Sequence, residues 1–159
     1  MASIDKEKIL IEEIKLVQDI IKRMASNSFN VKTWAVTLVA ATLLIKGNSN
    51  HTFIAFIPLF AFWFLDAYYL QQERLYRELH KWIIKYRMDH DDDLFNMSTT
   101  KFKNNVQSVV RIMFSISIFP FYFGILILLI AYIFIANTDH IKSFFECIQF
   151  CLNGVTNGK

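Results

Sequence analysis

The sequence predicts an all-α integral membrane protein: a transmembrane helical hairpin, a third transmembrane helix, and cytoplasmic amphipathic helices. The 159-residue chain is 54% hydrophobic and 19% charged, whereas soluble domains carry about 25% charged residues. Gly occurs 4 times and Pro twice, which is too few turn-forming residues for a many-stranded β protein. Apolar stretches divide the chain into five segments, namely residues 1–30, 31–69, 70–108, 109–138 and 139–159.

Residues 1–30 are predicted to form a cytoplasmic amphipathic helix. Leu10, Ile14, Val17 and Ile21 recur at steps of four and three residues, which places them on one helix face. Such a stripe can pack in a bundle, pair with copies of the chain, or lie on a membrane. Because the stripe is wide and the polar face carries charges of both signs, packing against protein is favoured. These four residues are therefore the candidates for oligomerisation.

Residues 31–69 are predicted to form the transmembrane hairpin, turning at Gly47–His51. With their interfacial flanks, its two arms approach the roughly 17–25 residues that a membrane-spanning helix needs. Folding about Ser49 brings Lys32 level with Asp66, each seventeen residues from the turn. Pairing would neutralise both charges inside a bilayer, and we expect the pair to have a structural or gating role. The alternatives are that each charge reaches the interface separately, or that the hairpin is buried in a soluble bundle.

Residues 70–108 are predicted to continue the second arm as a charged cytoplasmic helix, followed by an acidic loop. Asp89 and Asp91–Asp93 surround His90, but the spacing lacks the alternation and the Gly of a calcium-binding EF-hand loop. A solvated loop is favoured, and no metal site is expected.

Residues 109–138 are predicted to form the third transmembrane helix. Ile112–Thr138 contains no charged residue over 27 positions, which is long enough to cross a bilayer with tilt. Pro120 and Gly124 are candidates to kink it. Residues 139–159 are expected to form a short amphipathic segment and a tail, in which Cys147 and Cys151 are lipid-facing or packed thiols, with a disulfide as the alternative.

The distribution of Lys and Arg predicts the orientation. Six Lys and Arg residues lie before the hairpin or, in the case of Lys32, at its start; one lies at its turn, eight separate it from the third apolar stretch, and two follow that stretch. Since positive charge is retained on the cytoplasmic side, the N-terminus is expected in the cytoplasm.

Arg74 and His80 are weak catalytic candidates. Their spacing resembles the loose motif of HEPN ribonucleases, in which Arg steadies phosphate charge and His transfers protons. Six helical positions rotate by about 600°, which leaves the two side chains roughly 120° apart. The sequence contains no glycine-rich phosphate loop, zinc motif or nucleophile elbow. We therefore expect no enzyme activity, no cofactor and no direct nucleic-acid binding.

The stretches KTWAVTLVAA (Lys32–Ala41), FWFLDAYYLQQERLYRELH (Phe62–His80) and FNM (Phe95–Met97) resemble a widespread family of small bacterial membrane proteins. Similar multi-span proteins serve anti-phage systems, as membrane effectors of retrons and as the ring-shaped pore partner of type VI-B CRISPR systems. The resemblance implies a homo-oligomeric pore that permeabilises or depolarises the bacterial inner membrane during antiviral defence. Its partners would be the lipid bilayer, copies of itself and a cytoplasmic defence protein. The alternatives are a non-conducting membrane anchor or scaffold, and a membrane-tethered HEPN-like ribonuclease.

Overall fold

The computed structural model describes residues 2–44, 54–87 and 95–135, and these parts contain helices, turns and irregular segments but no strand. The elements in chain order are α1 (Ala2–Leu44), α2 (Phe56–Tyr86), the short 3-10 helix η3 (Thr100–Asn105) and α3 (Val109–Met113). A further helix begins at residue 119 and is described to residue 135. The all-α prediction is confirmed for the described residues.

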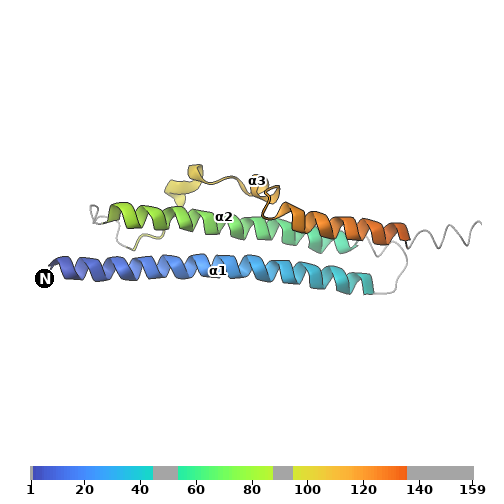
Figure 1. Cartoon of the computed structure of the whole chain (residues 1–159), viewed down its shortest axis with the longest axis horizontal. Coiled ribbons are helices and arrows are strands. Elements are labelled where there is room, and N and C mark those ends of the chain that lie inside the picture. The colour runs from blue at the N-terminus through green and yellow to red at the C-terminus, as the bar shows by residue number, and fades with distance from the viewer. Residues whose placement is uncertain (1, 45–53, 88–94, 136–159) are drawn as a thin grey trace, which may run out of the picture.

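The two long helices α1 and α2 lie antiparallel side by side and form a rod (Figure 1). At 1.5 Å per residue, the 43 residues of α1 extend about 65 Å. The predicted amphipathic helix and the first hairpin arm are therefore one unbroken helix, because no Gly or Pro occurs within α1. In α2, Pro58 occupies the first turn, where a missing backbone N–H is tolerated.

The sequence had suggested a single helix for the third apolar stretch, but the structure divides this stretch. Helix α3 ends at Met113, and residues 114–118 form turns in which the N–H of Ser115 donates to the carbonyl of Ile112 at 2.9 Å. A new helix then starts at residue 119. Pro120 lies in its first turn, where the fixed φ favours helix initiation, so it begins a helix instead of kinking one.

The prediction of membrane-spanning helices is wrong: among the described residues, none of the helices combines the length and the apolar character needed to cross a bilayer. In α1 the apolar part is preceded by Asn27, Asn30 and Lys32. In α2 it is interrupted by Asp66 and followed by amides and charges, and the third stretch is broken at residues 114–118. Two of the apolar segments are thus the ends of longer, mixed helices, and the third is divided by turns. These findings correct both the transmembrane hairpin and the third transmembrane helix.

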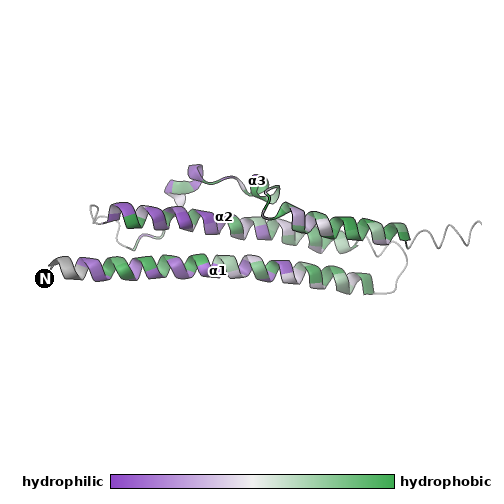
Figure 2. Ribbon diagram, in the orientation of Figure 1, coloured by the Kyte–Doolittle hydropathy of each residue, from purple (hydrophilic) through white to green (hydrophobic). Residues whose placement is uncertain are grey.

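Two hydrophobic clusters divide the rod. The apolar half comprises residues 29–44, 56–70 and 119–135, and the polar half comprises residues 6–28, 71–87 and 95–107. In the apolar half, Leu59, Trp63 and Tyr122 belong to a buried cluster shared by three helices. In the polar half, Val17 packs against Leu79 and Ile83 between α1 and α2. Figure 2 shows hydrophobic residues gathered towards one end of the rod and hydrophilic residues along the C-terminal part of α2.

Three predictions fall outside the described residues: the turn at Gly47–His51 about Ser49, the acidic cluster Asp89–Asp93, and the segment 139–159 with Cys147 and Cys151.

Candidate functional site

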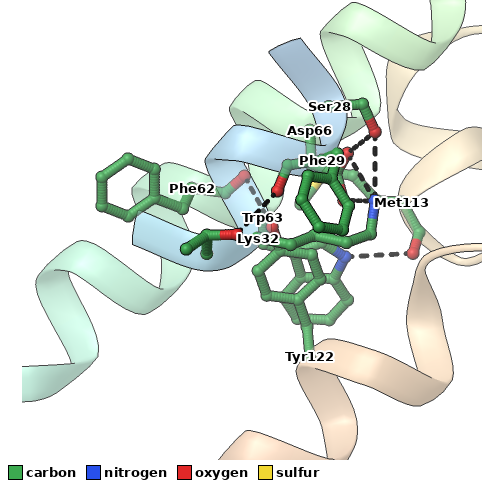
Figure 3. Close-up of polar contacts among 9 residues, drawn as sticks. Ser28, Phe29, Lys32, Phe62, Trp63, Asp66, Met113 and Tyr122 are labelled. Carbon is green, nitrogen blue, oxygen red and sulfur yellow. Dashed lines mark hydrogen bonds and ion pairs between the residues drawn. The ribbon is translucent and has the colours of Figure 1, made fainter. Parts of the chain in front are cut away.

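A buried polar cluster lies at the start of the apolar half, between α1 and α2. Ser28 and Lys32 are one turn apart on the face of α1 that meets α2. The Nζ of Lys32 lies 2.7 Å from Oδ2 of Asp66 and donates to Oδ1 at 2.9 Å. Lys32 also donates to the hydroxyl of Ser28 at 3.0 Å, and Ser28 donates to Oδ1 of Asp66 (Figure 3). The predicted pairing of Lys32 with Asp66 is confirmed.

Aromatic residues join this cluster to the third helical stretch. Trp63, one turn before Asp66 on α2, donates its indole N–H to the carbonyl of Met113 at 3.1 Å. The ring of Tyr122 stacks on Trp63 with centroids 5.8 Å apart, and its hydroxyl donates to the carbonyl of Phe62 at 3.2 Å (Figure 3). Burial, and then the negative charge of nearby Asp66, raise the pKa of Tyr122. Polar contacts thus fix three helices in one register.

The chemical character of this cluster is that of a buried ion pair: Oδ1 of Asp66 accepts the hydrogen bonds, while Oδ2 has the charge of Lys32 beside it but no aligned hydrogen bond. The Asp66 side chain is fully buried and that of Lys32 is 26% exposed, so the carboxylate depends on Lys32 and Ser28 for compensation. Removing one partner of a buried pair is strongly destabilising. Pairing within one protomer indicates a structural role, and the expected gating role stays a prediction.

A second buried ion pair closes the polar half of the rod. Arg87 donates through Nε to Oε2 of Glu13 at 2.8 Å and through Nη2 to Oε1. Both side chains are almost inaccessible, at 3% for Arg87 and 0% for Glu13. The guanidinium carbon lies 4.9 Å from the ring centroid of Trp82. This pair joins the first part of α1 to the end of α2.

The sequence analysis did not identify four residues that take part in the buried polar contacts between the helices, namely Glu13, Arg87, Ser28 and Tyr122. Only Ser28 had a local signal, because it precedes Lys32 by one helical turn. Glu13 and Arg87 are 74 residues apart in the sequence. They can be predicted as a pair only if the antiparallel alignment of α1 and α2 that brings Lys32 to Asp66 is extended along the whole rod.

The four residues predicted to join copies pack within the protomer. Val17 is fully buried against Leu79 and Ile83 of α2, while the others lie partly buried against the same cluster: Leu10, Ile14 and Ile21. The stripe therefore follows the alternative of packing in a bundle, and α2 of the same chain covers it.

Arg74 and His80 line two different grooves on α2. Arg74 lies with Asn105 and Gln107, and His80 with Gln18 and Lys22. His80 Nε2 is 3.3 Å from Nε2 of Gln18. In the part of the chain that is described, no hydrogen bond or ion pair joins the two candidates. No group of three His, Cys, Asp or Glu side chains there is arranged to hold a metal ion.

The most extensive surface feature is apolar. Large hydrophobic side chains are exposed on all three helices of the apolar half. They are Phe29, Trp34, Val36, Leu38 and Leu44 on α1; Ile57, Phe60, Phe64 and Tyr68 on α2; and Phe123, Ile127, Leu128, Ile130, Tyr132, Phe134 and Ile135 on the helix of residues 119–135.

No protein-family model matches the chain, and no curated protein or solved structure shows significant similarity to it.

Proposed function

We propose that the protein is a membrane-associated scaffold whose apolar half is immersed in the hydrocarbon of a bilayer while its polar half offers a docking surface to a water-soluble partner. The observation that carries this proposal is the exposure of large hydrophobic side chains on all three helices of the apolar half. Figure 2 shows hydrophobic residues gathered at this end of the rod. Monomeric proteins in water rarely expose apolar patches larger than a few hundred Å².

Lipid suits this surface better than one protein partner. The three helices share a buried core cluster, so the exposed side chains of each helix project away from it in different directions. A single partner protein covers one side, whereas liquid hydrocarbon covers all of them. The proposal therefore takes lipid acyl chains as the surrounding medium.

The length of the apolar half fits insertion into a bilayer from one face without spanning it. Its α1 part, residues 29–44, extends about 24 Å, compared with about 30 Å for the hydrocarbon core. A lone charge at such depth would be costly, but Lys32 and Asp66 neutralise each other at the start of this half. Partial immersion thus leaves no unpaired charge from this cluster in lipid.

A scaffold is favoured over a pore because Lys32 and Asp66, the two charges expected to have a structural or gating role, contact each other inside the protomer. A pore that acts in antiviral defence at the bacterial inner membrane stays a prediction based on resemblance, as does a ring of copies.

The test is binding to vesicles of dioleoylphosphatidylcholine, measured by flotation after removal of detergent. Phe64→Glu places a charge in the apolar half, and Ile84→Glu is its matched control on the same helix, since the two side chains are 53% and 57% exposed. Placing a carboxylate in hydrocarbon costs about 2–3 kcal/mol, so Phe64→Glu should weaken binding at least about tenfold while Ile84→Glu leaves it unchanged.

Equal flotation of both variants, or a wild-type protein that stays in the aqueous fraction, would overturn the proposal. A monodisperse oligomer in lipid-free buffer that Phe64→Glu dissociates would show instead that copies of the chain cover the apolar half.

A further inference from the structure

We propose that the boundary between the two halves of the rod binds the headgroups of anionic phospholipids through arginine side chains. This inference rests on the proposed function, because it takes the apolar half as immersed in hydrocarbon and concerns the lipids that surround its rim. The ligand is defined by its phosphate group and by the net negative charge of the lipid. The arginines that would bind it come from α1, α2 and α3.

Exposed aromatic side chains mark the level at which the rod would leave the bilayer. Trp34 is 59% exposed and Tyr68 is 42% exposed. Trp34 lies two residues from Lys32, and Tyr68 lies two residues from Asp66, so both are within about 3 Å of the buried ion pair along the rod. Trp and Tyr are enriched where acyl chains meet headgroups. The headgroups are therefore expected at the level of this pair and just beyond it, on the polar side.

Helix α3 packs against α2 near this level (Figure 1). Two hydrogen bonds fix its position, because Trp63 donates to the carbonyl of Met113 at 3.1 Å and Gln71 donates to the carbonyl of Gln107 at 3.0 Å. Asp66 lies between Trp63 and Gln71 in α2. Helix α3 is therefore beside the predicted membrane surface.

The outer surface of α3 and of the turns that follow it is apolar with one positive charge. Val110 and Phe114 are exposed, Ile116 is 93% exposed, and Arg111 is exposed among them. Apolar side chains next to a cation are typical of segments that lie at the boundary between headgroups and acyl chains. This surface would therefore place Arg111 beside the lipid phosphates.

Arg23 and Arg74 add positive charge on the two long helices. In the antiparallel alignment that brings Lys32 to Asp66, they lie about 12–14 Å from this pair on the polar side. The headgroup region extends about 5–8 Å beyond the hydrocarbon, so both arginines are within roughly a Debye length of it at physiological salt. Within the described residues, neither they nor Arg111 form an ion pair or a side-chain hydrogen bond.

The acidic residues close to these arginines are already paired. Residues 106–116, on either side of Arg111, contain no acid. The acids within five residues of the other two arginines each lie beside another cation: Asp19 is 3.6 Å from Lys22, Glu73 is 2.6 Å from Arg77, and Glu78 is 2.6 Å from Lys81. A guanidinium binds phosphate oxygens through parallel N–H donors. The charge and the chemistry of the boundary therefore fit an anionic headgroup.

The experiment compares flotation of the full chain with two kinds of vesicle. One consists of dioleoylphosphatidylcholine, and in the other about a third of this lipid is replaced by dioleoylphosphatidylglycerol. We expect binding to be at least about tenfold tighter with the anionic vesicles at low salt, since each basic residue near an anionic surface contributes roughly fivefold. The gain should disappear at about 1 M salt, where the Debye length falls to about 3 Å.

A double variant, Arg23→Gln with Arg111→Gln, removes two exposed charges at the boundary. Its matched control is Lys8→Gln with Lys15→Gln, which removes two exposed charges of α1 that lie about 26 Å or more from the level of Lys32. The boundary variant should lose at least about fivefold of the gain from phosphatidylglycerol, and the control variant should retain it.

Equal binding of wild type to both kinds of vesicle would overturn the headgroup site, and so would an equal loss in the two double variants. Phosphatidylcholine separates this outcome from failure of the proposed function. A wild type that floats with phosphatidylcholine and gains nothing from phosphatidylglycerol retains its immersed half and has no headgroup site. A wild type that floats only with the anionic vesicles, through the boundary arginines, supports the headgroup site and overturns immersion.

Discussion

At the scale of single residues, the Glu13–Arg87 pair dominates the polar half. Both side chains are almost fully buried, so Glu13→Gln would leave the Arg87 charge without compensation. We expect the free energy of unfolding to fall by about 3–5 kcal/mol, measured by urea titration of helical ellipticity. Replacing both residues, by Glu13→Leu with Arg87→Met, should recover most of this loss. A loss below about 1 kcal/mol for Glu13→Gln would indicate that water reaches the pair.

Tyr122 gives a residue-scale prediction with a defined pH dependence. Burial and the charge of Asp66 raise its pKa in the folded protein above the ordinary value of 10.0. Above about pH 10 the unfolded tyrosine loses its proton while the folded one keeps it, so the free energy of unfolding falls as pH rises, by at most about 1.4 kcal/mol per pH unit.

Tyr122→Phe removes this dependence but also the hydrogen bond to Phe62. The variant should be about 1 kcal/mol less stable than wild type at pH 7, and the two stability curves should converge between about pH 10 and pH 11. Urea titrations at a series of pH values measure both curves. Parallel curves across this range would contradict the raised pKa.

At the scale of elements, the sequence predicted that the chain is helical but did not predict where all of the helices begin and end. The scarcity of Gly and Pro predicted an all-helical chain, and folding about Ser49 predicted the contact of Lys32 with Asp66. The break at residues 114–118 had only Pro120 as its signal, and that proline was interpreted as a kink and not as the start of a new helix. The apolar stretches were assigned to lipid because hydropathy does not distinguish side chains that face a bilayer from those packed between helices, as Leu59 and Ala35 are.

Gly124 yields a prediction about the helix of residues 119–135. It has an ordinary negative φ, and an added Cβ would meet no atom within 4 Å. Gly124→Ala should therefore stabilise the protein by about 0.5–1 kcal/mol through helix propensity. Ala131→Gly, at an exposed position of the same helix, is the reverse control and should destabilise by a similar amount, with both measured by thermal unfolding. Destabilisation by Gly124→Ala would reveal a neighbour, such as a second copy, packed closely against this glycine.

At the scale of the whole molecule, one antiparallel register connects two chemically different halves. The contacts between Glu13 and Arg87, Gln18 and His80, and Lys32 and Asp66 all follow it. The sequence predicted the last of these from the turn position. It did not predict the others, because amphipathic periodicity shows which face of a helix is apolar but not which partner helix covers that face. The stripe of Leu10, Ile14, Val17 and Ile21 was assigned to oligomerisation because its spacing shows an apolar face but does not show that α2 of the same chain packs on it.

The Lys32–Asp66 pair provides the last prediction, because it links folding to membrane binding. Lys32→Met leaves the fully buried carboxylate of Asp66 without its cation. We expect a loss of about 3–5 kcal/mol in the free energy of unfolding, together with weaker vesicle binding, since an unpaired charge would enter hydrocarbon. The double variant Lys32→Met with Asp66→Leu should restore both properties, because scaffolding requires neutrality at this position and not the charges themselves. Flotation and urea titration measure the two effects. If instead the wild type conducts ions across vesicles and the double variant folds and binds but does not conduct, the charges line a pathway, and the pore replaces the scaffold as the function of this protein.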